Sequence, residues 1–153
     1  MRLEGDHDVI VRMRSLLRRA RSREIGGVLM GEQFGDGHFR IVDFSVDDLT
    51  GGFAHFVRDP DHHRIALAAF FERTGADYAR YNYLGEWHSH PSFPVHPSLE
   101  DCRSMTSLVE GERDIEFAVL MIVRLRFWFK VECSTNLFVR GQAPRPAAFS
   151  VVK

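Results

Sequence analysis

Residues 86–101 read E86-W-H-S-H-P-S-F-P-V-H-P-S-L-E-D101, which joins a strand pattern to a helix pattern through a proline-rich loop. The segment 81–90 predicts a strand that enters the core and emerges at its histidines. Pro91 favours leaving the strand ladder, because proline has no N–H to donate to it. Ser98 is a preferred helix N-cap, so the stretch predicts a strand, a short return loop and a helix that runs to about Leu108.

This stretch also concentrates side chains that bind metals. His88 and His90 point to the same side of the predicted strand, because strand side chains alternate between faces. Asp101 lies one turn into the predicted helix, on the same helix face as Ser98. Two imidazoles and one carboxylate suit a catalytic Zn²⁺ site, which keeps its fourth position for water. An H-x-H pair alone is usually structural, but the full spacing H-x-H-x7-S-x2-D favours a zinc site.

The flanking segments predict a mixed α/β domain, with a curved sheet flanked by helices. Helical spacing of apolar residues predicts helices over 8–23 and 60–74, and the second is expected to pack through Ile65, Ala68, Ala69 and Phe71. β-prone runs predict strands at 25–31, 38–46, 115–123, 127–133, 137–140 and 147–152, the first two joined by a turn at Gly35-Asp-Gly. No repeat or Pro/Gly linker divides the chain, so residues 1–153 are expected to form a single domain.

Composition limits the classes of function. The formal net charge is −1, which gives no basic excess for binding nucleic acid. The longest apolar run, Phe117 to Val123, is far shorter than the roughly 20 residues of a membrane helix. Cys102 and Cys133 lack a C-x-x-C spacing, and the first residues contain no signal-peptide pattern. The chain is therefore expected to be cytoplasmic, with reduced thiols.

The metal-binding pattern resembles the signature of the JAMM metalloproteases, also called the catalytic MPN or JAB domain. That signature places a Glu at the start of an early strand, well before H-x-H-x7-S-x2-D. Here Glu24 opens E24-I-G-G-V-L-M-G, and the later residues of the signature are all present. The resemblance covers roughly 9–133. It implies an MPN/JAB-like fold with cytidine-deaminase-like layering and one catalytic Zn²⁺ ion, with a bound water, on His88, His90 and Asp101.

The resemblance also implies roles for two further residues. Glu24 would take a proton from the water and pass it to the leaving amine. Ser98 would donate a hydrogen bond to the oxyanion of the tetrahedral intermediate. The contact between Glu24 and the ligands rests on the resemblance alone. On chemistry alone Glu32 and Glu86 are rival bases; Glu86 shares the strand face of the histidines, and we expect it to be structural or to support the ligands.

By resemblance, the chain is a short, stand-alone bacterial JAMM enzyme that acts like a deubiquitinase. Its substrate would be a ubiquitin-like protein or its conjugate, cleaved after the C-terminal tail in deconjugation or precursor processing, with activating and conjugating enzymes as associated partners in a modification or antiviral system. One alternative is a non-catalytic MPN scaffold. Another is a hydrolase for a sulfur-carrier-type or other small substrate. The sequence leaves both a monomer and a homodimer open.

Several other residues have less demanding interpretations. His96 is expected to be a solvated loop residue, Trp87 to pack beneath the site and Cys102 to be buried, while adjacent His62 and His63 make a poor metal pair.

Family members carry insertions that grip the substrate at positions that correspond to segments 50–59 and 103–114, and both segments are short here. The arginines of the first helix are interpreted as a solvated face, with recruitment of an acidic partner as the alternative: Arg12, Arg14, Arg18, Arg19, Arg21 and Arg23.

Overall fold

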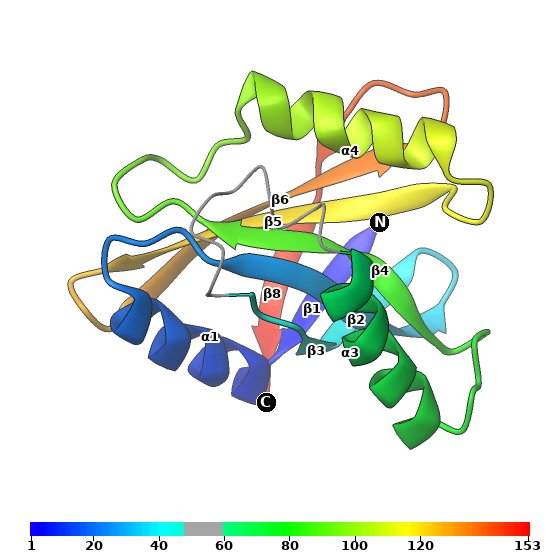
Figure 1. The fold of residues 1–153 in the computed structure, drawn as a ribbon, viewed down its shortest axis with the longest axis horizontal. Helices are drawn as coiled ribbons and strands as arrows, with labels where there is room; N and C mark the ends of the chain where they lie inside the picture. Colours follow the sequence, from blue (N-terminus) through cyan, green and yellow to red (C-terminus); the bar gives the residue numbers. More distant parts are fainter. Residues whose placement is uncertain (48–59) are drawn as a thin grey trace.

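The computed structural model describes residues 1–47 and 60–153. The described residues form one eight-stranded sheet in the order β7-β6-β5-β4-β2-β3-β1-β8, together with the helices α1, α3 and α4 (Figure 1). The elements are β1 (Arg2–Asp6), α1 (His7–Ala20), β2 (Gly26–Gly35), β3 (His38–Phe44), α3 (Pro60–Arg73), β4 (Tyr81–Ser89), α4 (Leu99–Gly111), β5 (Phe117–Arg126), β6 (Lys130–Val139), β7 (Arg145–Pro146) and β8 (Ala148–Val152).

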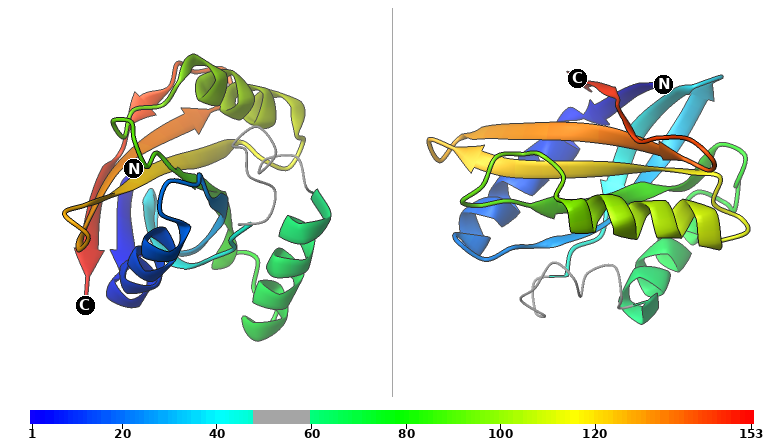
Figure 2. Two further views of the ribbon diagram at one scale, coloured as in Figure 1. Left: turned by 60° about the vertical axis from the view of Figure 1, so that its left-hand side comes forward. Right: turned by 90° about the horizontal axis from the view of Figure 1, so that it is seen from above.

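The sheet is mixed, and its parallel pairs explain the crossovers. β4 and β5 are parallel, so the chain returns between them through α4. β1 is parallel to both β3 and β8, whereas β2 is antiparallel to both β3 and β4. The sheet curves around α1, while α3 and α4 lie on its other face (Figure 2). This is the mixed, curved and helix-flanked sheet that the sequence predicts.

Each face of the sheet has its own core. On the α1 face, Met13 and Leu17 belong to a buried cluster with strand residues that include Leu29, Trp87 and Met121. On the other face, α4 and α3 make two separate contacts. The α4 cluster comprises Val95, Met105, Val109, Ala118, Leu120, Ile122 and Phe138, and the α3 cluster comprises Val28, Met30 and Phe70. The helix that carries Asp101 is therefore anchored on β5 and β6, next to β4.

Several expected element boundaries are wrong. The first helix ends at Ala20 rather than at residue 23, because Arg21 leaves helical geometry with φ of 55°. The segments 127–133 and 137–140 are not separate strands: Lys130–Val139 is one strand, and residues 127–129 form the turn before it. Strand β1 has no counterpart in the expected elements. Five residues long, it becomes a strand through its pairing with β3 and β8.

The expected packing face of α3 is right only for Phe71, which packs against the α3 cluster. Ile65 is 70% exposed, and Ala68 and Ala69 are exposed too. Phe70 is the buried residue, at 2% exposure, and it packs on Val28 and Met30 of β2. An alanine-rich helix has only a weak apolar stripe, so the large phenylalanine ring decides which side faces the sheet.

Gly85 is a position where the sheet tolerates no side chain. Its φ is 153°, and an added Cβ would lie 1.9 Å from the carbonyl oxygen of Val119 on β5. We expect Gly85→Ala to lower the free energy of unfolding by roughly 3 kcal/mol, measured by urea denaturation, because strand backbone must move. The control is Gly35→Ala, whose Cβ would meet nothing within 4 Å. Equal urea midpoints for the two variants would contradict this expectation.

None of the helices in the described ranges is long and apolar enough to cross a membrane.

Candidate metal centre

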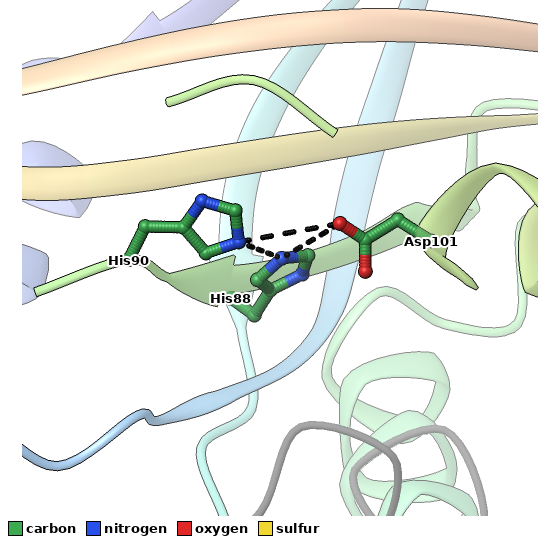
Figure 3. Close-up of side chains that lie close together, drawn as sticks. All are labelled: His88, His90 and Asp101. Atoms are coloured by element: carbon green, nitrogen blue, oxygen red, sulfur yellow. Dashed lines mark hydrogen bonds and ion pairs between the residues drawn. The ribbon is translucent and has the colours of Figure 1, made fainter. Parts of the chain in front are cut away.

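The side chains of His88, His90 and Asp101 converge where the end of β4 meets the start of α4 (Figure 3). The Nε2 atoms of the two histidines are 3.0 Å apart. Oδ2 of Asp101 lies 3.6 Å from Nε2 of His88 and 4.0 Å from Nε2 of His90. One ligand atom from each residue thus falls within 4.8 Å of the others. The structure brings together all three residues that the sequence analysis assigns to the metal.

Local structure holds each side chain in place. His88 is the penultimate residue of β4, and the backbone N–H of His90 donates to the Val123 carbonyl on β5 at 2.9 Å. Ser98 is the N-cap of α4: its Oγ accepts from the Asp101 N–H at 3.1 Å, and its own N–H donates to Asp101 Oδ2 at 2.7 Å. This capping box orients the carboxylate toward the histidines. The sequence prediction of Ser98 as an N-cap is confirmed.

Burial and charge set the protonation states of the cluster. His88 is fully buried and Asp101 is 1% exposed. Burial lowers the pKa of His88, although the hydrogen bond and charge of Asp101 oppose this. For Asp101, burial raises the pKa, but His88 and the hydrogen bonds of Ser98 outweigh it, so that the pKa ends below its usual value. A neutral imidazole beside an ionised carboxylate is the state that binds a cation.

A hydrogen bond to the loop between β4 and α4 fixes the tautomer of His90. Its Nδ1 lies 2.8 Å from the carbonyl oxygen of Pro94 in the return loop. A carbonyl only accepts hydrogen bonds, so Nδ1 carries the hydrogen and Nε2 keeps the lone pair that faces Asp101. The loop prolines therefore shape the return and also place an acceptor that orients a ligand.

The cluster fits a tetrahedral divalent ion. Ligand atoms bound to tetrahedral Zn²⁺ at about 2.0–2.1 Å lie about 3.4 Å from one another, which falls between the measured separations of 3.0 and 4.0 Å. Oδ1 of Asp101 is buried and has no hydrogen-bond partner within the described part of the chain. The oxygen that faces the two histidine nitrogens is instead Oδ2, so the fit to an ion rests on Oδ2 and the two Nε2 atoms and not on Oδ1.

Glu24 lies beside this cluster because of the register between β2 and β4. Gly26, the first residue of β2, pairs with His88, so Glu24, two residues before this strand, is brought near the end of β4. Glu24 is half-buried, and its charge acts on His88 in the direction that raises the pKa of the imidazole. The neighbouring Ser89 holds the strand end: its N–H donates to the Ile25 carbonyl at 2.8 Å, and its Oγ accepts from the Ile25 N–H at 3.0 Å.

Ser89 and Gly26 are the supporting residues that the sequence analysis missed. A Cβ on Gly26 would lie 2.4 Å from the Trp87 carbonyl oxygen and 2.9 Å from Cβ of His88, so glycine permits the close strand approach. The sequence carries a weak signal for both. Ser89 alternates away from the two histidines, and Gly26 belongs to a glycine pair that directly follows Glu24 and Ile25.

The rival carboxylates have other surroundings. Glu32 lies at the far end of the β2–β4 pairing, opposite Tyr81. Its Oε1 accepts from Nε of Arg80 at 2.7 Å and from the Tyr81 hydroxyl at 3.1 Å, so it is committed to a structural ion pair. Glu86 is 9% exposed on the ligand face of β4, and burial raises its pKa to about 7.

The remaining candidates are placed as follows. Trp87 is buried on the opposite face, where its Nε1–H donates to the Ser45 carbonyl at 2.8 Å, as expected of a residue beneath the site. His96 is exposed in the loop, also as expected. Cys102 is half-buried rather than buried, since it packs at the edge of the α4 cluster. His62 and His63 begin α3, and only their backbone is described.

The two segments compared with family insertions have different outcomes. Residues 50–59 lie outside the described residues. Most of 103–114 belongs to α4, which continues to Gly111, so a short link is all that connects this helix to β5.

The family comparison gives a direct match. The model of the prokaryotic homologs of the JAB domain matches residues 6–133, which include Glu24 and the whole metal cluster. The chain belongs to this family. Two relatives of this JAB domain, both named CD-NTase/cGAS isopeptidase, are 33% identical over 110 residues in Escherichia coli (strain TW11681) and 31% identical over 108 residues in Vibrio cholerae. The alignments cover 61% and 69% of this chain and 65% of each relative.

Solved structures agree on the fold. A protein from Desulfitobacterium hafniense superimposes with a TM-score of 0.70 at 20% identity, covering 99% of this JAB domain and 93% of that chain. A JAB1/MPN domain protein from Archaeoglobus fulgidus gives a TM-score of 0.51 at 15% identity, covering 99% and 98%. At these identities the likeness extends to the fold alone, and it confirms the MPN/JAB-like architecture expected from the sequence.

Proposed function

We propose that this JAB domain is a zinc-dependent isopeptidase or peptidase that hydrolyses the amide bond after the C-terminal tail of a conjugated protein. The observation that carries the proposal is the convergence of His88, His90 and Asp101, with the charge of Glu24 acting on His88. The names of the relatives suggest a first substrate to test, a CD-NTase or cGAS-like protein in isopeptide linkage. The second substrate to test is a ubiquitin-like conjugate or precursor. The enzymes that form the conjugate would be the functional partners of this JAB domain.

The chemistry divides among few residues. Held by His88, His90 and Asp101, a zinc ion would supply Lewis acidity and lower the pKa of water to about 7. Glu24 would accept a proton at its carboxylate and deliver it to the leaving amine. Ser98 uses its oxygen to accept from the Asp101 N–H, so its hydroxyl hydrogen remains available to donate to the oxyanion.

A cavity on the sheet face that α3 and α4 cover offers room for an extended tail, although His88, His90 and Asp101 do not line it. It has a volume of about 940 Å³ and lies between α3 and α4, with Leu67, Phe71 and Leu108 on its wall. Its lining reaches Glu86, two residues before His88 on the same strand face. A tail that lies in this cavity would have to continue past Glu86 for its last residue to reach the metal cluster. The complete ligand set makes the scaffold alternative the weaker one.

The test is a cleavage assay on defined bonds. Purified protein is incubated with a CD-NTase conjugate, a ubiquitin-like conjugate and a ubiquitin-like linear fusion, each with and without a chelator, and products are located by mass spectrometry. The expected result is a cut directly after the tail that the chelator prevents and Zn²⁺ restores. Absence of cleavage of all three substrates by the zinc-loaded protein would contradict the proposal.

The pH dependence follows from the burial of His88. Metal binding requires neutral imidazoles, and burial lowers the pKa of His88 below its usual value of 6.5. The neutral form therefore persists through the neutral range, and we expect zinc affinity to stay level from about pH 8 to 6.5 and to fall below that. Cleavage should begin to fall earlier, near about pH 7, because the water that zinc activates would be protonated there. Initial rates and zinc affinity measured over this range provide the check. Full activity at about pH 5 would contradict a two-histidine zinc site.

A further inference from the structure

The turn between β5 and β6 displays three aromatic side chains to solvent. Phe127, Trp128 and Phe129 are 69%, 66% and 61% exposed. The Phe129 N–H donates to the Arg126 carbonyl at 3.2 Å, and the two residues between them have φ of 52° and 66°. We refer to residues 127–129 as the aromatic tip.

The fold itself does not favour these residues here. A hairpin turn with positive φ at both central positions prefers Asn-Gly, because large side chains are strained in the left-handed region. Phe127 and Trp128 occupy these two positions. Their exposed rings gain little from burial to offset the strain. Strain combined with exposed apolar surface points to a role in binding.

The aromatic tip lies at the metal end of the sheet. β4 and β5 are parallel and end at the same edge, so the residues after His88 and the turn after β5 are neighbours. Between them and the C-terminal end of α1 is a second cavity, of about 360 Å³, lined by Leu17, Arg21, Ser89, Pro91, Arg124 and Trp128 among others. Figure 1 shows the β5–β6 turn beside this end of α1. One wall of the cavity is thus the segment that carries the histidine ligands.

Basic side chains surround this cavity. Nε of Arg18 donates to the Trp128 carbonyl at 2.6 Å, and the Arg126 guanidinium lies 5.2 Å from the Phe127 ring centre. Arg21 is exposed on the cavity wall. Glu132 offsets part of this charge through ion pairs with Arg124 and Arg126. The surface therefore combines apolar rings with a positive rim.

We propose that the aromatic tip and the 360 Å³ cavity form an exosite for a segment of the conjugated protein that carries acidic residues next to a large apolar one. This inference rests on the proposed function. The apolar side chain enters the cavity, its acidic neighbours meet Arg18 and Arg21, and the segment lies outside the scissile bond. A concave pocket suits a single side chain better than a flat bilayer does, which favours a protein segment over a membrane.

The test measures binding apart from catalysis. Glu24→Gln protein captures peptides from a random twelve-residue library, so that none is cut. The comparison protein adds Phe127→Asn and Trp128→Gly, which suit the turn and should leave the melting temperature equal or higher. The matched control instead adds Phe34→Asn, which removes an exposed aromatic from the far end of β2. We expect at least tenfold enrichment of acidic-apolar peptides that the comparison protein loses and the control keeps.

Two further measurements separate other occupants of this surface. Trp87 is buried, so acrylamide quenching reports mainly on Trp128, and enriched peptides should protect it. Protection by phosphatidylcholine–phosphatidylglycerol vesicles instead of peptides would overturn the proposal, as would a dimer in light scattering that the tip substitutions dissociate. Absence of enrichment, or enrichment that the comparison protein retains, would also overturn it. Failure of zinc-dependent cleavage, by contrast, would count against the proposed function, since this binding assay needs no turnover.

Discussion

Replacing His88 with alanine is expected to abolish zinc binding and to reduce cleavage by at least about 10³-fold, since the ion supplies several kcal/mol of transition-state stabilisation. The side chain is fully buried and belongs to the group of three that could hold an ion within residues 1–47 and 60–153. Asp101→Ala should lose zinc as well, and in addition should destabilise α4, because the carboxylate also completes the capping box. Metal analysis of the purified variants, together with initial cleavage rates, measures both effects.

Two control variants separate the loss of zinc binding from a loss of stability. Asp101→Asn keeps an oxygen that can accept from the Ser98 N–H but removes the charge, so it should weaken zinc binding with less loss of stability. His96→Ala removes an exposed histidine from the loop between β4 and α4, and it should change neither the zinc content nor the cleavage rate. Stoichiometric zinc in His88→Ala would refute the assignment of this ligand.

Replacing Glu24 with glutamine should leave zinc in place and reduce turnover by roughly 10²–10⁴-fold, the range for general acid–base catalysis. Glutamine has nearly the same shape but no basic oxygen. Glu24 comes two residues before Gly26, which pairs with His88, and it does not belong to the candidate ligand group of His88, His90 and Asp101. Zinc content, turnover number and Michaelis constant are measured on the same preparation.

The matched control is Glu32→Gln, in β2 a short distance along the chain from Glu24, where the carboxylate forms an ion pair with Arg80. It is expected to lower stability modestly and to leave the turnover number within a few-fold of wild type. Equal losses of turnover in the two variants would show that Glu24 has no special role. Loss of zinc from Glu24→Gln would instead show that this carboxylate binds the metal.

The local parts of the site could be predicted from the sequence. Alternation along a strand places His88 and His90 on one face, and the Ser98 cap places Asp101 one turn into a helix. The position of Glu24 could not be predicted from local rules, because it depends on the strand register that aligns Gly26 with His88. Such pairing is set by packing across the whole sheet rather than by propensity.

The errors also have physical causes. Local propensity gives Phe127 and Trp128 to a strand, yet the chain forms a turn there, against the preference of both residues. β6 is long because it pairs with β5 along its whole length. This pairing keeps the polar residues Ser134 and Asn136 within one strand. Strand β1 exists because β3 and the distant β8 flank it. Each error falls where tertiary contacts outweigh local sequence.

The most direct test of the central claim is a zinc titration of metal-free protein, followed by cleavage of an isopeptide-linked conjugate. The account predicts no activity without metal, a linear rise with added Zn²⁺ and a plateau at one equivalent per chain. His88→Ala protein should show no rise under the same conditions. Full cleavage by metal-free protein, or recovery of the His88→Ala variant at one equivalent, would contradict the account.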